Sequence, residues 1–127
     1  MSTYRALEGT DVALESLTVL SPQPDPGEGI QYTKVTVAAD QSINRQGPYF
    51  EFRWSELSNA DYNTILGIFG LDDSASTNVT IYTRDETYQN WVRKNGTAQQ
   101  PIPGDTVRWD LRPRRIVIRV TNLETAS

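Results

Sequence analysis

Strict alternation of apolar and polar side chains constrains this chain more than any other feature. In residues 49–54, YFEFRW, the side chains of Phe50, Phe52 and Trp54 fall on one side of an extended strand, and the alternate residues fall on the other. This period of two is typical of a half-buried β-strand, because successive side chains of a strand point to opposite faces. A buried aromatic ring covers roughly 150–250 Å². We therefore predict that this strand anchors the core.

Six further segments are typical of short strands. They are residues 11–20, read as a strand with a bulge, and residues 30–39, 79–84, 87–96, 106–111 and 114–123. Asp85 and Glu86 stand between two of them, close to a two-residue hairpin connection. Loops separate the others: a polar loop over residues 40–48, and two extended Pro/Gly-rich loops over residues 21–29 and 98–105.

One segment, about residues 58–69, follows a helical pattern instead. Ser58 is a good N-cap, and Asp61 three residues later forms a variant of the capping box. Gly70 stands where a helix ends. The spacing i, i+3, i+4, i+7 gives one apolar stripe, made by Tyr62, Ile65, Leu66 and Phe69. The sequence thus predicts a single capped helix of about three turns.

These elements together predict a mainly β (α+β) fold. About seven short strands with one flanking helix indicate a β-sandwich or small barrel. The chain has 127 residues, which suits one core. It shows no internal repeat and no dividing linker, so we expect a single domain over residues 1–127.

The sequence contains neither cysteine nor histidine. The usual thiolate nucleophile, the usual general base and the commonest metal ligands are therefore missing. The adjacent pair Asp72–Asp73 is typical of a solvated loop. We expect no enzyme activity, no cofactor and no metal site, and hence no catalytic residue and no small-molecule substrate. No segment resembles a signal peptide or a membrane span, so we expect a soluble protein made in a cytosol, with no membrane partner.

Charge is distributed unevenly along the chain. Residues 1–83 carry 4 basic and 11 acidic side chains, whereas residues 84–127 carry 8 basic and 5 acidic ones. An acidic face of one copy could therefore contact a basic face of the next, although an uneven solvent-exposed surface would give the same pattern. Direct binding of nucleic acid is the less favoured reading, because the basic residues alternate with apolar and acidic ones.

Arginine is enriched at protein interfaces, and a proline-rich loop loses little entropy when it docks. The candidate subunit interface therefore comprises Arg93, Arg108, Arg112, Arg114, Arg115 and Arg119, with Pro22, Pro24, Pro26, Pro101 and Pro103 from the two loops. A different class of function, a carbohydrate-binding module, would use Tyr88, Trp91 and Trp109 as a sugar platform, although core packing is the favoured interpretation of Trp109, since Val107 and Leu111 lie on its side of the strand.

The order of elements resembles a known family. An aromatic strand ending at Trp54 runs into SELSNADYNTILGIFG, a strand pair carries YTRDETYQNWV, and the chain closes with RWDLRPRRIVIRVTNLE. This resembles bacteriophage tail proteins of the distal-tail and minor-tail group related to the tail-tube fold. The matching positions are Leu57, Ser58, Asp61, Leu66 and Phe69 on the helix, and Ile116, Ile118, Val120 and Leu123 on the closing strand. The resemblance covers residues 49–124 and leaves the N-terminal third outside it.

The resemblance implies a non-enzymatic virion structural protein that is made in the cytoplasm of a host bacterium. Its partners would be copies of itself, in a ring that is commonly hexameric, and other virion proteins. The tail component could be the distal tail, the tail tube or a tail-completion protein. A capsid cement or decoration protein is an alternative within the virion, and the carbohydrate-binding β-sandwich module is the alternative outside it.

Overall fold

The computed structural model describes residues 3–25, 29–100 and 114–127. Within them, seven strands form one antiparallel sheet in the order β2-β1-β5-β6-β7-β4-β3. The strands are β1 (Arg5–Glu8), β2 (Thr18–Val19), β3 (Gln31–Val37), β4 (Ile43–Leu57), β5 (Ser76–Arg84), β6 (Trp91–Gln99) and β7 (Arg114–Thr125). A 3-10 turn, η1 (Leu14–Ser16), and one helix, α1 (Asn59–Phe69), complete the fold. The predicted mainly β fold with a single flanking helix is confirmed.

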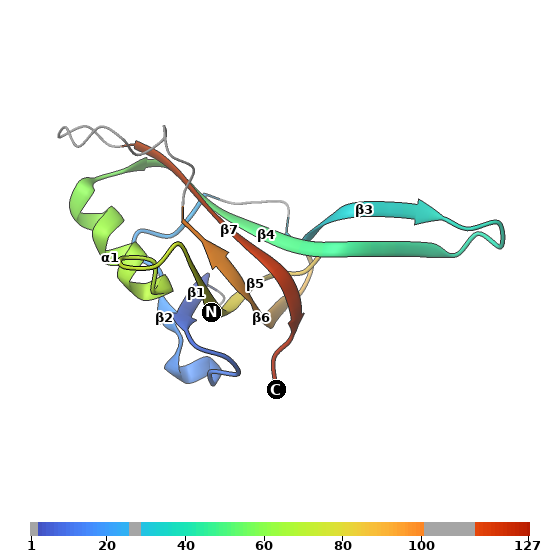
Figure 1. Cartoon of the computed structure of the whole chain (residues 1–127), viewed down its shortest axis with the longest axis horizontal. Coiled ribbons are helices and arrows are strands. Elements are labelled where there is room, and N and C mark those ends of the chain that lie inside the picture. Colours follow the sequence, from blue (N-terminus) through green and yellow to red (C-terminus); the bar gives the residue numbers. More distant parts are fainter. Residues whose placement is uncertain (1–2, 26–28, 101–113) are drawn as a thin grey trace.

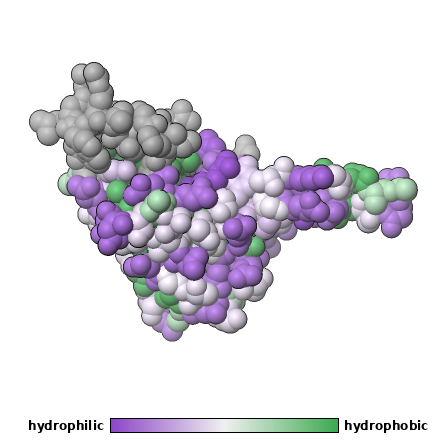
Figure 2. Space-filling view, in the orientation of Figure 1, coloured by the Kyte–Doolittle hydropathy of each residue, from purple (hydrophilic) through white to green (hydrophobic). Residues whose placement is uncertain are grey.

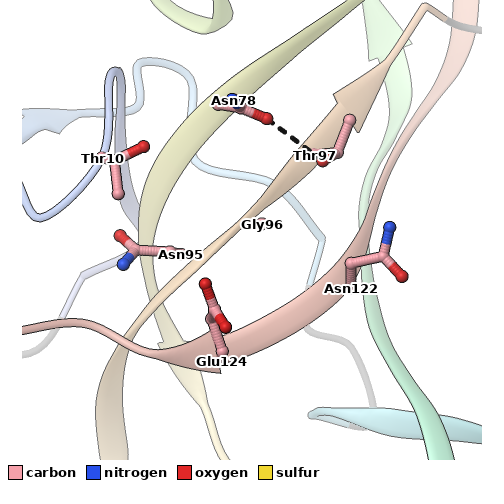
Figure 3. Close-up of a pocket in the computed structure, with 7 residues that line it drawn as sticks. All are labelled: Thr10, Asn78, Asn95, Gly96, Thr97, Asn122 and Glu124. Carbon is pink, nitrogen blue, oxygen red and sulfur yellow. Dashed lines mark hydrogen bonds between the residues drawn. The ribbon is translucent and has the colours of Figure 1, made fainter.

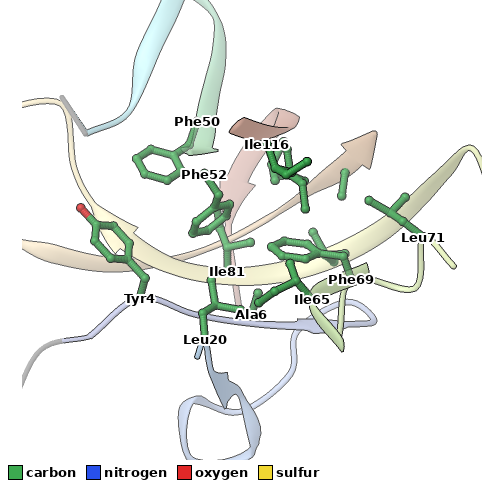
Figure 4. Packing of buried hydrophobic residues seen from close by; sticks show 14 of the residues in the cluster. Tyr4, Ala6, Leu20, Phe50, Phe52, Ile65, Phe69, Leu71, Ile81 and Ile116 are labelled. Carbon is green, nitrogen blue, oxygen red and sulfur yellow. The ribbon is translucent and has the colours of Figure 1, made fainter. Parts of the chain in front are cut away.

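The sheet curls so that its two ends share one core (Figure 1). Tyr4, just before β1, packs its ring 5.9 Å from that of Phe50 on β4, although three strands separate β1 from β4 in the sheet order. Helix α1 closes the core, with the ring of Phe69 at 5.4 Å from that of Phe52 (Figure 4). The predicted anchor residues Phe50, Phe52 and Trp54 are all buried. The two faces of the sheet are therefore distinct: an inner face around this core and an outer face toward solvent.

Helix α1 has the caps that the sequence predicts. The Ser58 hydroxyl accepts a hydrogen bond from the Asp61 amide at 3.2 Å, and Gly70 ends the helix in the left-handed conformation, with φ of 71°. Tyr62, Ile65 and Phe69 from the predicted stripe are buried. Local capping chemistry and core packing thus agree on this element.

The N-terminal part of the chain differs from the expectation. Residues 11–20 do not form one bulged strand: they contain the 3-10 turn η1, and then only Thr18–Val19 in β2. Leu17 and Leu20 are both buried, so a spacing of three rather than two brings this segment to the core. Strand β1 was not predicted, because its four residues, RALE, show too little alternation to stand out.

Three connections also have bounds that differ from the expectation. Residues 43–48 were expected in a polar loop but begin the 15-residue strand β4. The connection between β5 and β6 spans Asp85–Asn90 rather than two residues, since the Asp85 carboxylate accepts hydrogen bonds from the Thr87 amide at 3.1 Å and from the Asn90 side chain at 3.2 Å. Ala98 and Gln99, expected in a loop, belong to β6. The expected strand over residues 106–111 lies outside the described residues.

Candidate functional site

A long hairpin projects from the body of the molecule (Figure 1). Strands β3 and β4 pair in register from Gln31↔Tyr49 to Val37↔Ile43. From Tyr49 onward β4 also pairs with β7, so its first part extends past the neighbouring strand. Residues 33–47, which we call the arm, are all exposed. A hairpin of this length that packs on no core of its own chain contributes little to folding, and this makes the arm the candidate interaction site.

The two sides of the arm differ in chemistry. Residues opposite each other in an antiparallel pair lie on the same side of the ribbon. Val35 pairs with Arg45 and Val37 pairs with Ile43, so one side is largely apolar. The other side is polar, since it is built from the pairs Lys34↔Gln46 and Thr36↔Asn44.

The apolar side of the arm continues the outer face of the sheet. Along β4, Phe50, Phe52 and Trp54 point to the core, so the odd-numbered residues of this strand lie on the outer face. Ile43 and Arg45 share that parity, and no register shift interrupts the pairing between Ile43 and Trp54. The apolar side of β4 therefore changes from the inner face in the body to the outer face in the arm.

Apolar exposure is concentrated on the arm. Val35, Val37 and Ile43 are 55%, 64% and 54% exposed, respectively. Among the described residues, the other large hydrophobic side chains with comparable exposure are Val19 and Tyr88. Figure 2 shows this hydrophobic surface toward the end of the projection. End strands of soluble sheets usually carry charges or proline to prevent pairing, so β-branched residues here indicate a surface that is covered in an assembly.

The end of the arm is closed by a hydrogen-bonded turn. The Ala38 amide donates to the Ser42 carbonyl at 2.8 Å, and Gln41 has a positive φ of 72°. The Asp40 carboxylate accepts hydrogen bonds from the Ser42 amide at 3.0 Å and from the Ser42 hydroxyl at 2.6 Å. These two bonds, the hydroxyl first, lower the pKa of Asp40 below its ordinary value of 3.8.

The turn should therefore loosen in acid. Because the pKa of Asp40 is lower in the folded arm, its contribution to the turn is complete above pH 3.8 and is lost as the pH falls through the lower folded value. Hydrogen exchange followed by NMR should show faster exchange of the Ser42 amide in Asp40→Ala than in the unchanged protein at neutral pH. Asp40→Asn is the matched control, since it keeps an acceptor oxygen without the charge. Equal Ser42 exchange rates in all three proteins would contradict this role.

Side-chain contacts hold the base of the arm. The Tyr49 hydroxyl donates to the Gln31 side chain at 2.9 Å. The Arg119 guanidinium lies 4.5 Å from the centre of the Tyr49 ring and forms an ion pair with Glu51 at 3.0 Å. Burial alone would raise the pKa of Glu51, but hydrogen bonds from Arg53 and Arg119 outweigh burial and lower it.

Gly47 also lies at the base of the arm. Its φ is 67°, and a Cβ there would lie 1.9 Å from Thr33 Oγ1, so this position excludes other side chains.

Of the six predicted arginines, the structure describes the side chains of Arg93 and Arg119. Arg119 is held by Glu51, as above, and the half-buried Arg93 donates to the carbonyl of Ser127. Both guanidinium groups are thus engaged within the chain. Arg114 and Arg115 lie at the start of β7. Arg108 and Arg112 lie outside the described residues.

Pro24, one of the predicted interface residues, is buried within its own chain. The Gln23 side chain donates to the carbonyls of Tyr4 and Leu20, at 3.0 and 2.6 Å, and the Trp54 indole donates to the Pro22 carbonyl at 2.9 Å. Residues 21–25 are thus fastened to the body instead of extending as an arm. The side chain of Pro22, within this segment, is exposed. Pro26, Pro101 and Pro103 lie outside the described residues.

The proposed sugar platform is not assembled from the aromatic residues that the structure describes. Trp91 packs in the body, 4.9 Å from the Tyr4 ring and 5.4 Å from the Tyr82 ring. The Arg84 guanidinium covers both Trp91 and Tyr88, at 4.9 and 4.6 Å from the ring centres. Trp109 lies outside the described residues. Of the two residues of this platform that the structure describes, Tyr88 is exposed and Trp91 is partly buried.

A polar hollow of about 230 Å³ lies on the outer face between β5, β6 and β7 (Figure 3). It forms where Asn95↔Glu124 and Thr97↔Thr121 leave an extra residue in β7, and Asn122 there has a φ of 56°. The lining residues are Thr10, Asn78, Asn95, Gly96, Thr97, Asn122 and Glu124. Asn78 already accepts a hydrogen bond from Thr97 at 3.3 Å. The hollow offers hydrogen-bonding groups and one carboxylate, but none of its lining residues is aromatic.

Two further findings concern the described part of the chain. It contains no group of three or more His, Cys, Asp or Glu residues that could hold a metal ion, and no helix there is long and apolar enough to cross a membrane. No family model matches the chain, and no curated protein or solved structure matches it.

The sequence pattern did not predict that the arm is a projecting hairpin. The sequence feature that could have indicated it is the pair of segments TKVTV and INRQ on either side of a short turn. These segments contain few apolar residues, and in the structure those residues are exposed.

Proposed function

We propose that this protein is a non-enzymatic virion structural protein, a ring-forming subunit of a bacteriophage tail. In this proposal the arm of each copy contacts a neighbouring copy, and other virion proteins contact the completed ring. The tail component is the distal tail, the tail tube or a tail-completion protein, and the ring is expected to be hexameric, as is common in the family that the sequence resembles. The protein would be made in the host cytoplasm and act in the virion.

The observation that carries the proposal is the exposed apolar side of the arm. Val35, Val37 and Ile43 each have more than half of the side chain open to solvent. Covering the open part of each would contribute about 1 kcal/mol, since full burial of such a side chain is worth roughly 1.5–3 kcal/mol. Repeated at every contact around a closed ring, these contributions favour assembly over the monomer.

The body supports a structural role as well. Its core includes strand β4 and the capped helix α1, two consecutive elements among those on which the resemblance to tail proteins rests. A packed body with one projecting hairpin is suited to assembly, because the hairpin of one subunit can contact the body of the next.

The proposal is tested by the oligomeric state of the purified protein. Light scattering after gel filtration and native mass spectrometry, over a range of concentrations, should give one closed oligomer, and negative-stain images should show rings. A monomer at every concentration would overturn assembly by the protein alone. Antibody labelling of assembled particles then distinguishes the two virion roles: label on the tail supports the proposal, and label over the shell indicates a capsid cement protein.

A further inference from the structure

We propose that strand β2 of one copy receives strand β3 from the arm of the next copy, so that the sheet continues across the subunit contact. This inference rests on the proposed ring-forming function and names the surface that accepts the arm. The partner is a second copy of this chain.

The first support is the topology of the sheet. Its order ends at β2 on one side and at β3 on the other, so each of these described strands has an unpaired edge, and in the arm residues 43–48 of β4 have one as well. The Leu20 amide donates to the Tyr4 carbonyl on the inner side of β2 at 3.2 Å. Because hydrogen-bonded and non-hydrogen-bonded pairs alternate in antiparallel sheets, the amide and carbonyl of Val19 face away from β1. β2 therefore presents a donor and an acceptor to an incoming strand.

The second support is the position of the exposed apolar residues. Val19, on β2, is 44% exposed, and the arm carries the exposed residues Val35 and Val37 on β3. Val19 pairs with Arg5, which in turn pairs with Tyr82, and the next residues along these strands, Ala6 and Ile81, are buried.

Val19 therefore lies on the outer face, as Val35 and Val37 do. If β3 pairs with β2 of another copy, these valines become neighbours on one side of the joined sheet.

The third support is charge. The segment leading into β2, residues 8–19, contains Glu8, Asp11 and Glu15 and no basic residue. The arm has Lys34 and Arg45 against one acidic residue, Asp40. The two surfaces are thus opposite in sign, which favours the contact between β2 and β3 over contacts between two arms or between two β2 edges.

These features define a head-to-tail contact. The arm and β2 are different surfaces at opposite ends of the sheet order, so each copy gives its arm to one neighbour and receives an arm from the other. Contacts of this kind generate a closed ring when the rotation between copies closes. A two-fold dimer would instead require the same two copies to exchange their arms, and covalent linking in a variant with cysteines in β2 and in the arm would then stop at the dimer.

The chain has no cysteine, so engineered cysteines report the contact without background. The variant Val19→Cys/Val37→Cys should form disulfides between copies on mild oxidation. A ladder of covalent oligomers, up to the size of the ring, should then appear on a non-reducing gel. Val19→Cys/Val35→Cys tests a second register of the same contact. An equal mixture of Val19→Cys and Val37→Cys single variants should stop at the covalent dimer, because each chain then has one thiol.

The control is Val19→Cys/Ser74→Cys, since Ser74 is exposed in the segment between α1 and β5 and lies outside the arm. It should assemble without giving a ladder. Rings without a ladder from cysteine at either 35 or 37 would overturn β2 as the acceptor and leave the ring-forming function intact. Monomers in every variant and in the unchanged protein would overturn both.

Discussion

Replacing Phe52 with alanine should cost about 3–5 kcal/mol of unfolding free energy, the usual cost of removing a buried phenylalanine. Phe52 is fully buried in the core. Its ring packs against the rings of Phe50 at 4.8 Å, Phe69 at 5.4 Å, Tyr4 at 6.1 Å and Trp54 at 6.3 Å. The substitution leaves a cavity where strand β4, helix α1 and the segment before β1 meet. Since small domains are stable by roughly 5–15 kcal/mol, the loss is a large part of the total.

Urea denaturation followed by tryptophan fluorescence measures this loss. Val35→Ala is the matched control, because its side chain is mostly exposed on the arm and its removal should change the free energy of unfolding by no more than about 0.5 kcal/mol. A loss below about 1 kcal/mol in Phe52→Ala would show that the core is not arranged around this ring.

The elements predicted well from sequence are those whose defining residues are close together in the chain and whose apolar side chains are buried in the structure. Helix α1 has its N-cap, its apolar stripe and its terminating glycine within 13 residues, 58–70. In the body part of β4, apolar residues alternate and face the core. In both elements the spacing of apolar residues along the sequence indicates which face is buried. The fold class could therefore be predicted without the structure.

The arm could not be derived in the same way, because its apolar side faces no core in the chain. Residues 43–48 contain one large apolar side chain, Ile43, among polar residues and a glycine, so the pattern resembles a loop. Its strand conformation comes from pairing with β3, which is a contact between segments and not a property of either one. The exposed valines of β3 were predicted in a strand, but only the structure shows that this strand leaves the body.

Composition did not predict how the proline-rich segment and the arginines are engaged within the chain. Proline content suggested that residues 21–29 form a docking loop, yet Gln23 and Trp54 fasten residues 21–25 to the body. The arginines of the C-terminal half suggested a basic surface, but Arg93 and Arg119 are engaged by groups of the same chain. The partner of each arginine depends on the register between strands, and a count of charged residues does not give that register.

The largest effect on assembly is expected from Val35→Asp/Val37→Asp. If the apolar side of the arm is covered in the ring, this variant loses two buried valines and forces two carboxylates out of water, which costs several kcal/mol at each contact. The affinity between copies should fall by at least about 100-fold, since each 1.4 kcal/mol is a factor of ten. The free energy of unfolding should change little, because both side chains are mostly exposed in the single chain.

The control for this variant keeps its charge and changes the side of the arm. Thr36→Asp/Asn44→Asp adds the same two carboxylates to the polar side of the hairpin, where Thr36 pairs with Asn44. Both variants share the low preference of aspartate for strands and the same net charge, so the difference between them isolates the apolar contact. Sedimentation velocity should find Val35→Asp/Val37→Asp as a monomer at concentrations where the control still forms the oligomer. If both variants assemble as the unchanged protein does, the arm is not the coupling element.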